Sequence, residues 1–483
     1  MAIEAQRDDA VGMAGLVARG DVSAVELVEA AITRIERVND QLNAVVAKIY
    51  DRALDQARRP RPGLFSGVPI LLKELMPYPG LPSTMASVAY ADAATGPIPV
   101  IVERIESAGF IVLGRTNSSE FGALPVTQSD LFGATRNPWS PAHDSGGSSG
   151  GAAAAVAAGM LPLAQGGDGG GSIRIPASAC GVFGLKVSRG RISSSPGANP
   201  DGFGTHHALT RTVRDSAAFL DSVRGSLPGD RWTCPPPEDS YLALMERASG
   251  PLRIAVAPNG FMGHGEAHPE CVRAVEIAAT LCASLGHHVD VAQPLIDHEA
   301  VNDAFLGIAA ISTARAVADL RTRHGKVPRR MLGTWIWGAA RHGAKMRPWA
   351  SVGMTECLQR AAYQIADFQQ RYDVILTPVL HQPPLRIGEI IDECAFLEMR
   401  ERMLAYCPHT AVLNATGQPA MSVPLHWTSQ GLPIGTQFIG RFGEEDVLYR
   451  LARQLELAQP WAERWAPINC WADQQSPGAS AFI

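Results

Sequence analysis

The sequence predicts an α/β protein built around a largely buried sheet. Its 483 residues are 46% hydrophobic and 18% charged, which is enough apolar material for a large core. Segments with strand and helix patterns alternate along the chain, as they do when helices cover a sheet. We find no internal repeat, so each segment has to be interpreted separately.

The N-terminal part predicts a capped helix and then a buried strand. Ser23 and Glu26 form a capping box ahead of an apolar stripe with helical spacing. The run GVPILLK at residues 67–73 predicts a short buried strand that ends on a lysine. Residues 99–108 predict a helix, which Gly109 ends.

The next part is rich in small residues. Residues 110–114 predict a strand, residues 145–151 a loop and residues 152–158 an alanine-rich helix. A short apolar segment and a glycine cluster at 166–171 follow, directly before Ser172. Prolines, glycines and serines then predict long surface loops over a further stretch, residues 195–250.

The C-terminal half returns to alternating elements. Residues 252–258, 269–285 and 288–291 predict a strand, a helix and a strand in a β-α-β-like unit, and residues 300–370 are mainly helical. The remaining predicted elements are a strand at 372–378, a strand pair at 421–427 and 434–439, a helix at 444–457, and a polar, frayed end from residue 474.

Charge and composition restrict the class of partner. The formal net charge is −5, from 42 basic and 47 acidic residues without a long run of one sign, which disfavours a nucleic-acid partner. The eight scattered cysteines predict reduced thiols in a cytoplasmic protein, and the N-terminus has no signal-peptide pattern. Residues 145–167 carry no charge, but they are mostly small residues with Pro162 among them, so no membrane span is expected.

Two glycine-rich clusters, each with a serine, carry the clearest chemical signal. Ser148 and Ser172 are separated by a loop, a helix, a short strand and a second loop, a unit that can bring both serines to one pocket. Backbone N–H groups of a glycine run can bind an oxyanion, so Gly169, Gly170, Gly171 and Ser172 are predicted to form an oxyanion hole. The alternative is a flexible glycine loop beside an unreactive hydroxyl.

These clusters also resemble a known family. The runs GGSSGG (146–151) and GGDGGGSIRIPASACGVFGLK (166–186) are similar to the signature of the amidase signature family. Further similar blocks are GVPILLK (67–73), FGATRNPW (132–139), TGQPAMSVP (416–424) and GLPIG (431–435), so the resemblance extends over nearly the whole chain.

The resemblance implies a catalytic triad. By position, the family's nucleophile corresponds to Ser172, its bridging serine, which follows a cis peptide bond, to Ser148, and its lysine to Lys73. Lys73 would have to be largely neutral to act as a base, and burial beside the apolar residues 70–72 would lower its pKa. Without the motif, the alternative interpretation of Lys73 would be a solvated charge on the protein surface.

The resemblance also implies an architecture and a reaction. It implies a mixed central sheet with helices on both faces, a single catalytic domain at 1–470 with a variable substrate-pocket region at 195–410, and a tail at 471–483. No cofactor and no metal is implied, and the protein is expected to be a monomer or homodimer without a nucleic-acid or membrane partner. The overall pattern is similar to amidases of aryl acylamides and nylon-type oligomers, so we expect a neutral, fairly apolar amide substrate, with esters and carbamates as further substrates.

Other interpretations remain open. A glutaminase subunit of a tRNA-dependent amidotransferase shares the signature, and a catalytically inactive scaffold protein is a third interpretation. The run at 331–337, together with Trp349, either lines the substrate pocket or belongs to the core. Asp168 and Arg174 are expected to form a buried ion pair, and Cys180 to be a small core residue.

Three residues depart from the family pattern without altering the triad. Gly169 occupies a position that often carries a larger residue, and it is expected to leave extra room beside the scissile carbonyl. Ala152 stands where serine is frequent, and Glu74 follows the lysine where aspartate is common. The G-x-S-x-G pattern at 146–150 is not expected to be an α/β-hydrolase elbow, because no apolar strand precedes it.

Overall fold

The largest sheet has eight strands and is mixed. The computed structural model describes residues 8–472 except 198, 326, 348 and 393. The strand order is β12-β11-β13-β15-β14-β9-β10-β8; β11 is parallel to β12 and β13, and the other neighbours are antiparallel. The strands are β8 (Leu163–Asp168), β9 (Phe183–Lys186), β10 (Thr205–Thr210), β11 (Arg253–Val256), β12 (His288–Val291), β13 (Val374–Pro378), β14 (Ala420–Trp427) and β15 (Pro433–Gly440).

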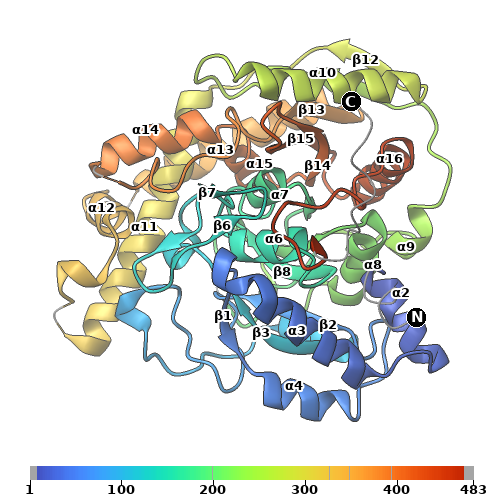
Figure 1. Ribbon diagram of the computed structural model, residues 1–483. Coiled ribbons are helices and arrows are strands. Elements are labelled where there is room, and N and C mark those ends of the chain that lie inside the picture. The colour runs from blue at the N-terminus through green and yellow to red at the C-terminus, as the bar shows by residue number, and fades with distance from the viewer. Residues whose placement is uncertain (1–7, 198, 326, 348, 393, 473–483) are drawn as a thin grey trace.

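A smaller sheet of three strands lies beside β8. It has the order β1 (Val45–Lys48), β3 (Ile111–Thr116) and β2 (Pro69–Lys73). Every residue of β2 is buried, and β2 packs against β8 of the large sheet, as Figure 1 shows below the centre of the molecule. This contact brings the end of β2 to the glycine cluster at 166–171, which begins within β8.

Helices cover both faces of the large sheet. Buried residues of α8 (Val213–Val223), α10 (Pro269–Ser284) and α16 (Glu445–Ala458) share one hydrophobic cluster with strands of the sheet. Those of α6 (Gly150–Ala157) and α7 (Arg174–Cys180) belong to another cluster, which also includes residues of α3 (Ala24–Leu42). The sheet is therefore enclosed on both sides, and α6 and α7 lie between it and the N-terminal helices (Figure 1).

A group of four helices lies to one side of the sheet. These helices, α11 (His298–His324), α12 (Thr334–Gly343), α13 (Ala350–Phe368) and α14 (Phe396–Tyr406), appear in yellow and orange at the left of Figure 1. The remaining helices of three residues or more and the short strands are α2 (Ala10–Arg19), α4 (Tyr50–Ala57), η1 (Val88–Tyr90), α5 (Val100–Ser107), η2 (Glu120–Gly122), β4 (Gln128–Ser129), β5 (Gly133–Ala134), β6 (Arg136–Asn137), β7 (Ser140–Asp144), α9 (Tyr241–Leu244), η3 (Arg329–Met331) and α15 (Ala411–Thr416).

Most elements expected from the sequence are present. The capping box at Ser23 and Glu26 has both of its hydrogen bonds, and α5 ends before Gly109, whose φ of +96° favours glycine. Parallel pairing of β11 and β12 around α10 confirms the β-α-β unit, and the α/β class with a mixed, doubly covered sheet is confirmed. No helix in the described part of the chain is long and apolar enough to cross a membrane.

The loop prediction for residues 195–250 is wrong in part. This stretch contains β10, which hydrogen-bonds between β8 and β9, and the helix α8, whose inward side is fully buried. Thr212 caps α8 by accepting the Asp215 N–H, and Val213, Ala217 and Leu220 supply its apolar stripe. The pattern was hidden because β10 carries histidines and threonines where a central strand usually carries aliphatic residues.

The glycine cluster is also not all loop. Gly166 and Gly167 belong to β8 and pair with His207 and His206 of β10. A β-carbon on Gly166 would lie 2.8 Å from a Leu209 methyl carbon, so a larger residue there would have to displace the Leu209 side chain. The frayed end that the sequence predicts from residue 474 lies outside the described residues.

Candidate active site

Lys73 lies at the buried end of β2 with its amine turned toward a serine. The Nζ donates to Ser148 Oγ at 2.7 Å and to the Gly167 carbonyl at 3.4 Å. The backbone N–H of Lys73 donates to Gln165 Oε1 at 3.0 Å, which fixes the end of β2 against β8. The side chain is only 2% exposed, so the interpretation of this lysine as a solvated surface charge is wrong.

The environment of Lys73 favours a neutral amine. Burial lowers the pKa of Lys73 from 10.5 to about 7, because an ammonium loses hydration inside the protein, while the charge of Asp168 opposes part of this effect. At neutral pH a large fraction of Lys73 therefore carries a lone pair. An amine in this state can accept a proton from the hydroxyl to which it is hydrogen-bonded.

The two glycine-rich loops that carry the serines meet. Ser148 precedes α6, and the peptide bond between Gly147 and Ser148 is cis. The N–H of Ser149 donates to the carbonyl of Ser172 at 3.2 Å, so the residue next to Ser148 contacts the loop that precedes α7. Ser172 is 8% exposed and lies at the wall of a cavity.

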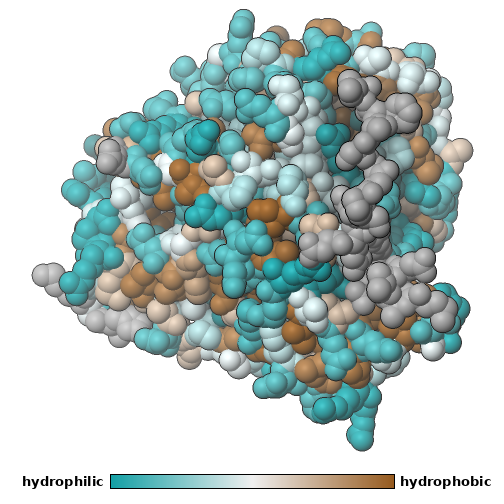
Figure 2. Space-filling view, viewed as in Figure 1, coloured by the Kyte–Doolittle hydropathy of each residue, from teal (hydrophilic) through white to brown (hydrophobic). Residues whose placement is uncertain are grey.

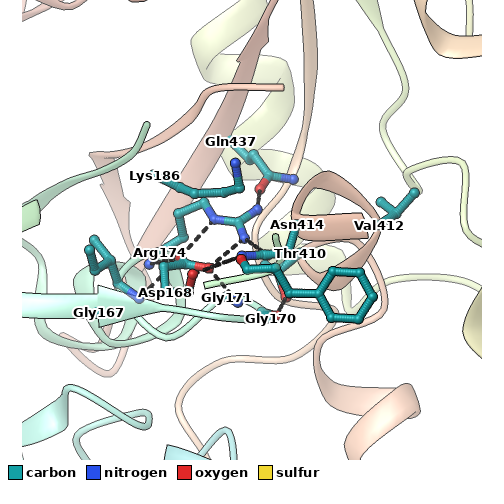
Figure 3. A network of polar contacts seen from close by, with 12 residues as sticks. Gly167, Asp168, Gly170, Gly171, Arg174, Lys186, Thr410, Val412, Asn414 and Gln437 are labelled. Atoms are coloured by element: carbon teal, nitrogen blue, oxygen red, sulfur yellow. Dashed lines mark hydrogen bonds and ion pairs between the residues drawn. The ribbon is translucent and has the colours of Figure 1, made fainter. Parts of the chain in front are cut away.

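A buried network holds the loop of Ser172. Asp168 and Arg174 form a bidentate ion pair, in which Arg174 Nη2 donates to Asp168 Oδ1 at 2.9 Å and Nε donates to Oδ2 at 3.0 Å. Both side chains are fully buried, which confirms the expected pair. Arg174 also donates to Asn414 Oδ1 at 2.6 Å and to Gln437 Oε1 at 2.8 Å (Figure 3). Burial alone would raise the pKa of Asp168, but the charge and hydrogen bonds of Arg174 hold it well below its usual range.

The predicted oxyanion hole requires one correction. The N–H of Gly171 donates to Asp168 Oδ1 at 2.7 Å, so this donor is already used inside the loop. A β-carbon on Gly169 would meet nothing within 4 Å, which agrees with the expected extra room at that position. Gly169, Gly170 and Ser172 line the cavity and remain the candidate donors.

Three residues of this site were missed in the sequence. Asn414 donates to the Asp168 carbonyl and to Asp168 Oδ1, each at 2.9 Å, and Thr410 Oγ1 donates to the Gly170 carbonyl at 2.7 Å. Gln437 is the third, through its bond to Arg174. Gln437 lies two residues after the matching block GLPIG, and this position is the sequence signal that could have identified it.

The cavity beside Ser172 is mostly apolar and has a volume of about 570 Å³. Asp303 and Arg400, the two ionic side chains in its wall, form an ion pair with each other. In Figure 2 a brown, apolar area lies on the left of the molecule, near α11 and α12 of Figure 1. The aromatic and methionine side chains of the wall are Phe203, Phe305, Trp335, Met346, Met354, Phe396 and Met403.

The aromatic run at 331–337 has a divided role. Trp335 lines the cavity, whereas Trp337 packs on the hydrophobic core and Trp349 is 65% exposed. The run therefore contributes both to the cavity wall and to the core, so both alternatives from the sequence are partly correct. The exposed Trp349 belongs to neither, so its assignment is wrong.

Neighbouring polar residues are structural. Cys180 is fully buried, burial raises the pKa of its thiol, and its Sγ donates to the Ser145 carbonyl, so its expected core role is confirmed. Glu74 forms a buried ion pair with Arg115 at 3.1 Å. Among the described residues, no group of three or more His, Cys, Asp or Glu side chains could hold a metal ion.

A serine on a glycine-rich loop, near a second serine bonded to a buried lysine with a lowered pKa, is typical of hydrolases that form an acyl-enzyme. Residues 26–448 match the family described as Amidase, and the chain belongs to the amidase signature family. It is therefore an amidase, and the resemblance stated from the sequence motifs is confirmed.

Relatives match over almost their whole length. The 6-aminohexanoate-cyclic-dimer hydrolase of Paenarthrobacter ureafaciens is 35% identical over 489 residues, which cover 94% of this chain and 96% of that protein. A structure of 6-aminohexanoate cyclic dimer hydrolase complexed with substrate has a TM-score of 0.88 at 33% identity, with coverage of 96% and 99%. A bacterial aryl acylamidase of the amidase signature family has a TM-score of 0.86 at 28% identity, with coverage of 94% and 97%.

Proposed function

We propose that this amidase cleaves its substrate with Ser172 as nucleophile, Ser148 as bridge and Lys73 as base. The observation that carries the proposal is the 2.7 Å contact between the buried Lys73 Nζ and Ser148 Oγ. Ser149 bonded to the Ser172 carbonyl supports it, because this contact brings the two serine loops together.

The reaction proceeds through an acyl-enzyme. Ser172 Oγ attacks the amide carbonyl carbon, its proton passes to Ser148, and the Ser148 proton passes to Lys73. The N–H groups of Gly169, Gly170 and Ser172 stabilise the oxyanion. Lys73 then returns a proton through Ser148 to the leaving nitrogen as the C–N bond breaks. Water attacks the ester by the same proton path and releases the acid.

The cavity supports a neutral, apolar or aryl amide as substrate. Apart from the mutually paired Asp303 and Arg400, and from His342 and Cys407, its side chains are aromatic, aliphatic, methionine or small polar groups. A site that protonates an amine leaving group also has the means to cleave esters and carbamates, whose reactions pass through the same intermediate. The relatives named for cyclic amide dimers and aryl acylamides are consistent with this class.

The variable region at 195–410 supplies much of this cavity. Phe203, Phe305, Trp335 and Phe396 all come from it, whereas the three triad residues precede it in sequence. We therefore propose that residues 195–410 determine which substrate is accepted. We also propose that residues 1–470 form a single catalytic domain.

A glutaminase subunit is the competing function. Glutamine carries an ammonium and a carboxylate, which would need the two ionic groups of the cavity, and these are bonded to each other. Purified protein acting alone on 4-nitroanilides, carbamates, esters and glutamine separates the two functions. Glutamine turnover without anilide turnover would favour the glutaminase.

Substitution and labelling test the triad. Ser172→Ala should abolish turnover, and a fluorophosphonate should label Ser172 in the wild type, as mapped by mass spectrometry. Ser178→Ala is a matched control, because Ser178 is buried on α7 and donates to nothing in the triad. Labelling of Ser148 or Cys180, or an active Ser172→Ala variant, would contradict the assignment.

A further inference from the structure

A histidine that has no place in the proposed reaction lies next to the lysine. His206 is on β10, directly opposite Gly167 of β8, and the Gly167 carbonyl accepts from Lys73 Nζ. His206 Nδ1 lies 3.3 Å from the point that a β-carbon on Gly167 would occupy, so the imidazole covers this glycine.

The imidazole lies on the face of β8 that carries the Gln165 side chain. Gln165 is two residues before Gly167 on β8, and its side chain reaches the backbone N–H of Lys73 on β2. Side chains two residues apart on a strand share a face, and directly opposite residues on antiparallel strands share it too. His206 therefore lies on the same face of the sheet as Gln165, whose side chain reaches Lys73.

In the part of the chain that the structure describes, the ring nitrogen His206 Nδ1 is left without a hydrogen-bond partner. This atom is buried and has no hydrogen-bond partner among the described residues, which is uncommon for a buried polar atom. The adjacent His207, on the other face of β10, has partners for both ring nitrogens, in the Ala208 carbonyl and the Tyr449 hydroxyl. Both ring nitrogens of the buried His207 thus have hydrogen-bond partners, whereas Nδ1 of His206 has none among the described residues.

The histidine is neutral wherever the enzyme would work. Burial, and then the charge of Lys73, lower the pKa of His206 to about 4. A neutral ring protonated on Nε2 presents Nδ1 as a hydrogen-bond acceptor.

We propose that His206 is a positioning residue that accepts a hydrogen bond from the Lys73 ammonium formed during catalysis, directly or through one water. This inference rests on the proposed function. The ammonium has three N–H groups, of which Ser148 Oγ and the Gly167 carbonyl accept two. His206 supplies the third acceptor. No proton moves to the ring: Ser172 gives its proton to Ser148, Ser148 gives its own proton to Lys73 Nζ, and Lys73 returns a proton through Ser148 to the leaving nitrogen.

The effect is a change in the basicity of the lysine. The other ionic groups around Lys73 are Asp168, which favours the ammonium, and the adjacent buried pair of Glu74 and Arg115. Without the His206 acceptor the ammonium loses stabilisation, so the lysine becomes a weaker base. The acidic limb of the pH profile then moves to lower pH, while the rate on the plateau falls.

The test is the pH dependence of kcat/KM on a 4-nitroanilide for the wild type, His206→Leu and His206→Gln. In His206→Leu we expect the midpoint of the acidic limb to fall by about one pH unit and the plateau by about three- to tenfold. His206→Gln should recover part of both, because its carboxamide oxygen can accept an N–H. His207→Gln is the matched control and should leave the midpoint unchanged.

Several outcomes would overturn the inference. A His206→Leu variant with wild-type midpoint and plateau would do so, as would a lower plateau without a displaced midpoint, or an equal displacement in His207→Gln. If His206→Leu does not fold, His206→Met and His206→Gln decide, since a weak thioether acceptor should displace the midpoint more than an amide. An active Ser172→Ala variant would instead reject the proposed function itself.

Discussion

Replacing Lys73 by methionine is expected to stabilise the protein while abolishing turnover. The pKa of Lys73 in the folded protein is about 7, against the usual 10.5, which is a difference of three to four pH units. One unit corresponds to about 1.4 kcal/mol, so the buried amine costs about 4 kcal/mol of folding free energy at and below neutral pH. Methionine has a similar length and no charge, and it forfeits only the bond to Ser148, about 1 kcal/mol.

The pH dependence gives this prediction its sign. Because the folded pKa is below the unfolded one, the unfolded chain binds more protons between pH 7 and 10.5, and wild-type stability rises with pH across that range through this group. The gain from Lys73→Met should therefore be full below about pH 7, shrink as the pH rises above 7, and vanish above about pH 10.

Thermal unfolding measured at several pH values tests it. A net gain of about 3 kcal/mol raises Tm by about 3 °C in a chain of this size. Lys48→Met is the control, because Lys48 is an exposed lysine on β1, and its variant should show no such pH-dependent gain. If Lys73→Met unfolds at or below the wild-type temperature at pH 7, or if its gain does not shrink in alkali, the cost assigned to burial is refuted.

Three further predictions concern the site. Wild-type kcat/KM should rise about tenfold from pH 6 to 8 as Lys73 loses its proton, and a flat profile would exclude this lysine as the base. Asp168→Asn should lose about 3–5 kcal/mol of stability, seen in thermal unfolding, because Arg174 stays buried without its counter-charge; an unchanged Tm would contradict the role of the pair. Gly169→Ala should fold like the wild type because its β-carbon enters open space, whereas Gly171→Ala, with its β-carbon 2.4 Å from Thr410 Oγ1 and φ of +130°, should lower both Tm and activity. Equal behaviour of the two glycine variants would show that the loop is not held as described.

Local signals were sufficient for much of the site. Lys73 could be placed at a strand end from its apolar neighbours, and both serine loops from their glycines. Ion pairing of Asp168 with Arg174 was also foreseeable, because the two residues are only six positions apart in sequence. These features depend on residues close together in sequence, where spacing limits the geometry.

Long-range contacts could not be predicted in the same way. Asn414 and Gln437 reach Arg174 across 240 and 263 residues, and no local pattern links them. β10 was missed because it is stabilised by pairing with β8 and β9 rather than by an aliphatic sequence. The Gly171 N–H was assigned to the oxyanion hole because its bond to Asp168 depends on how the loop folds back.

The division of the cavity wall between α11–α14 and the loop of Ser172 has a consequence for how this protein can change. Lys73 and the serines are anchored by strands and by the Asp168 network, while the opposite wall of the cavity is provided by side chains of a distinct helical group. Mutations in those helices can reshape what is accepted without disturbing the groups that break the bond. Directed evolution toward new acyl or amine moieties should therefore concentrate its libraries there.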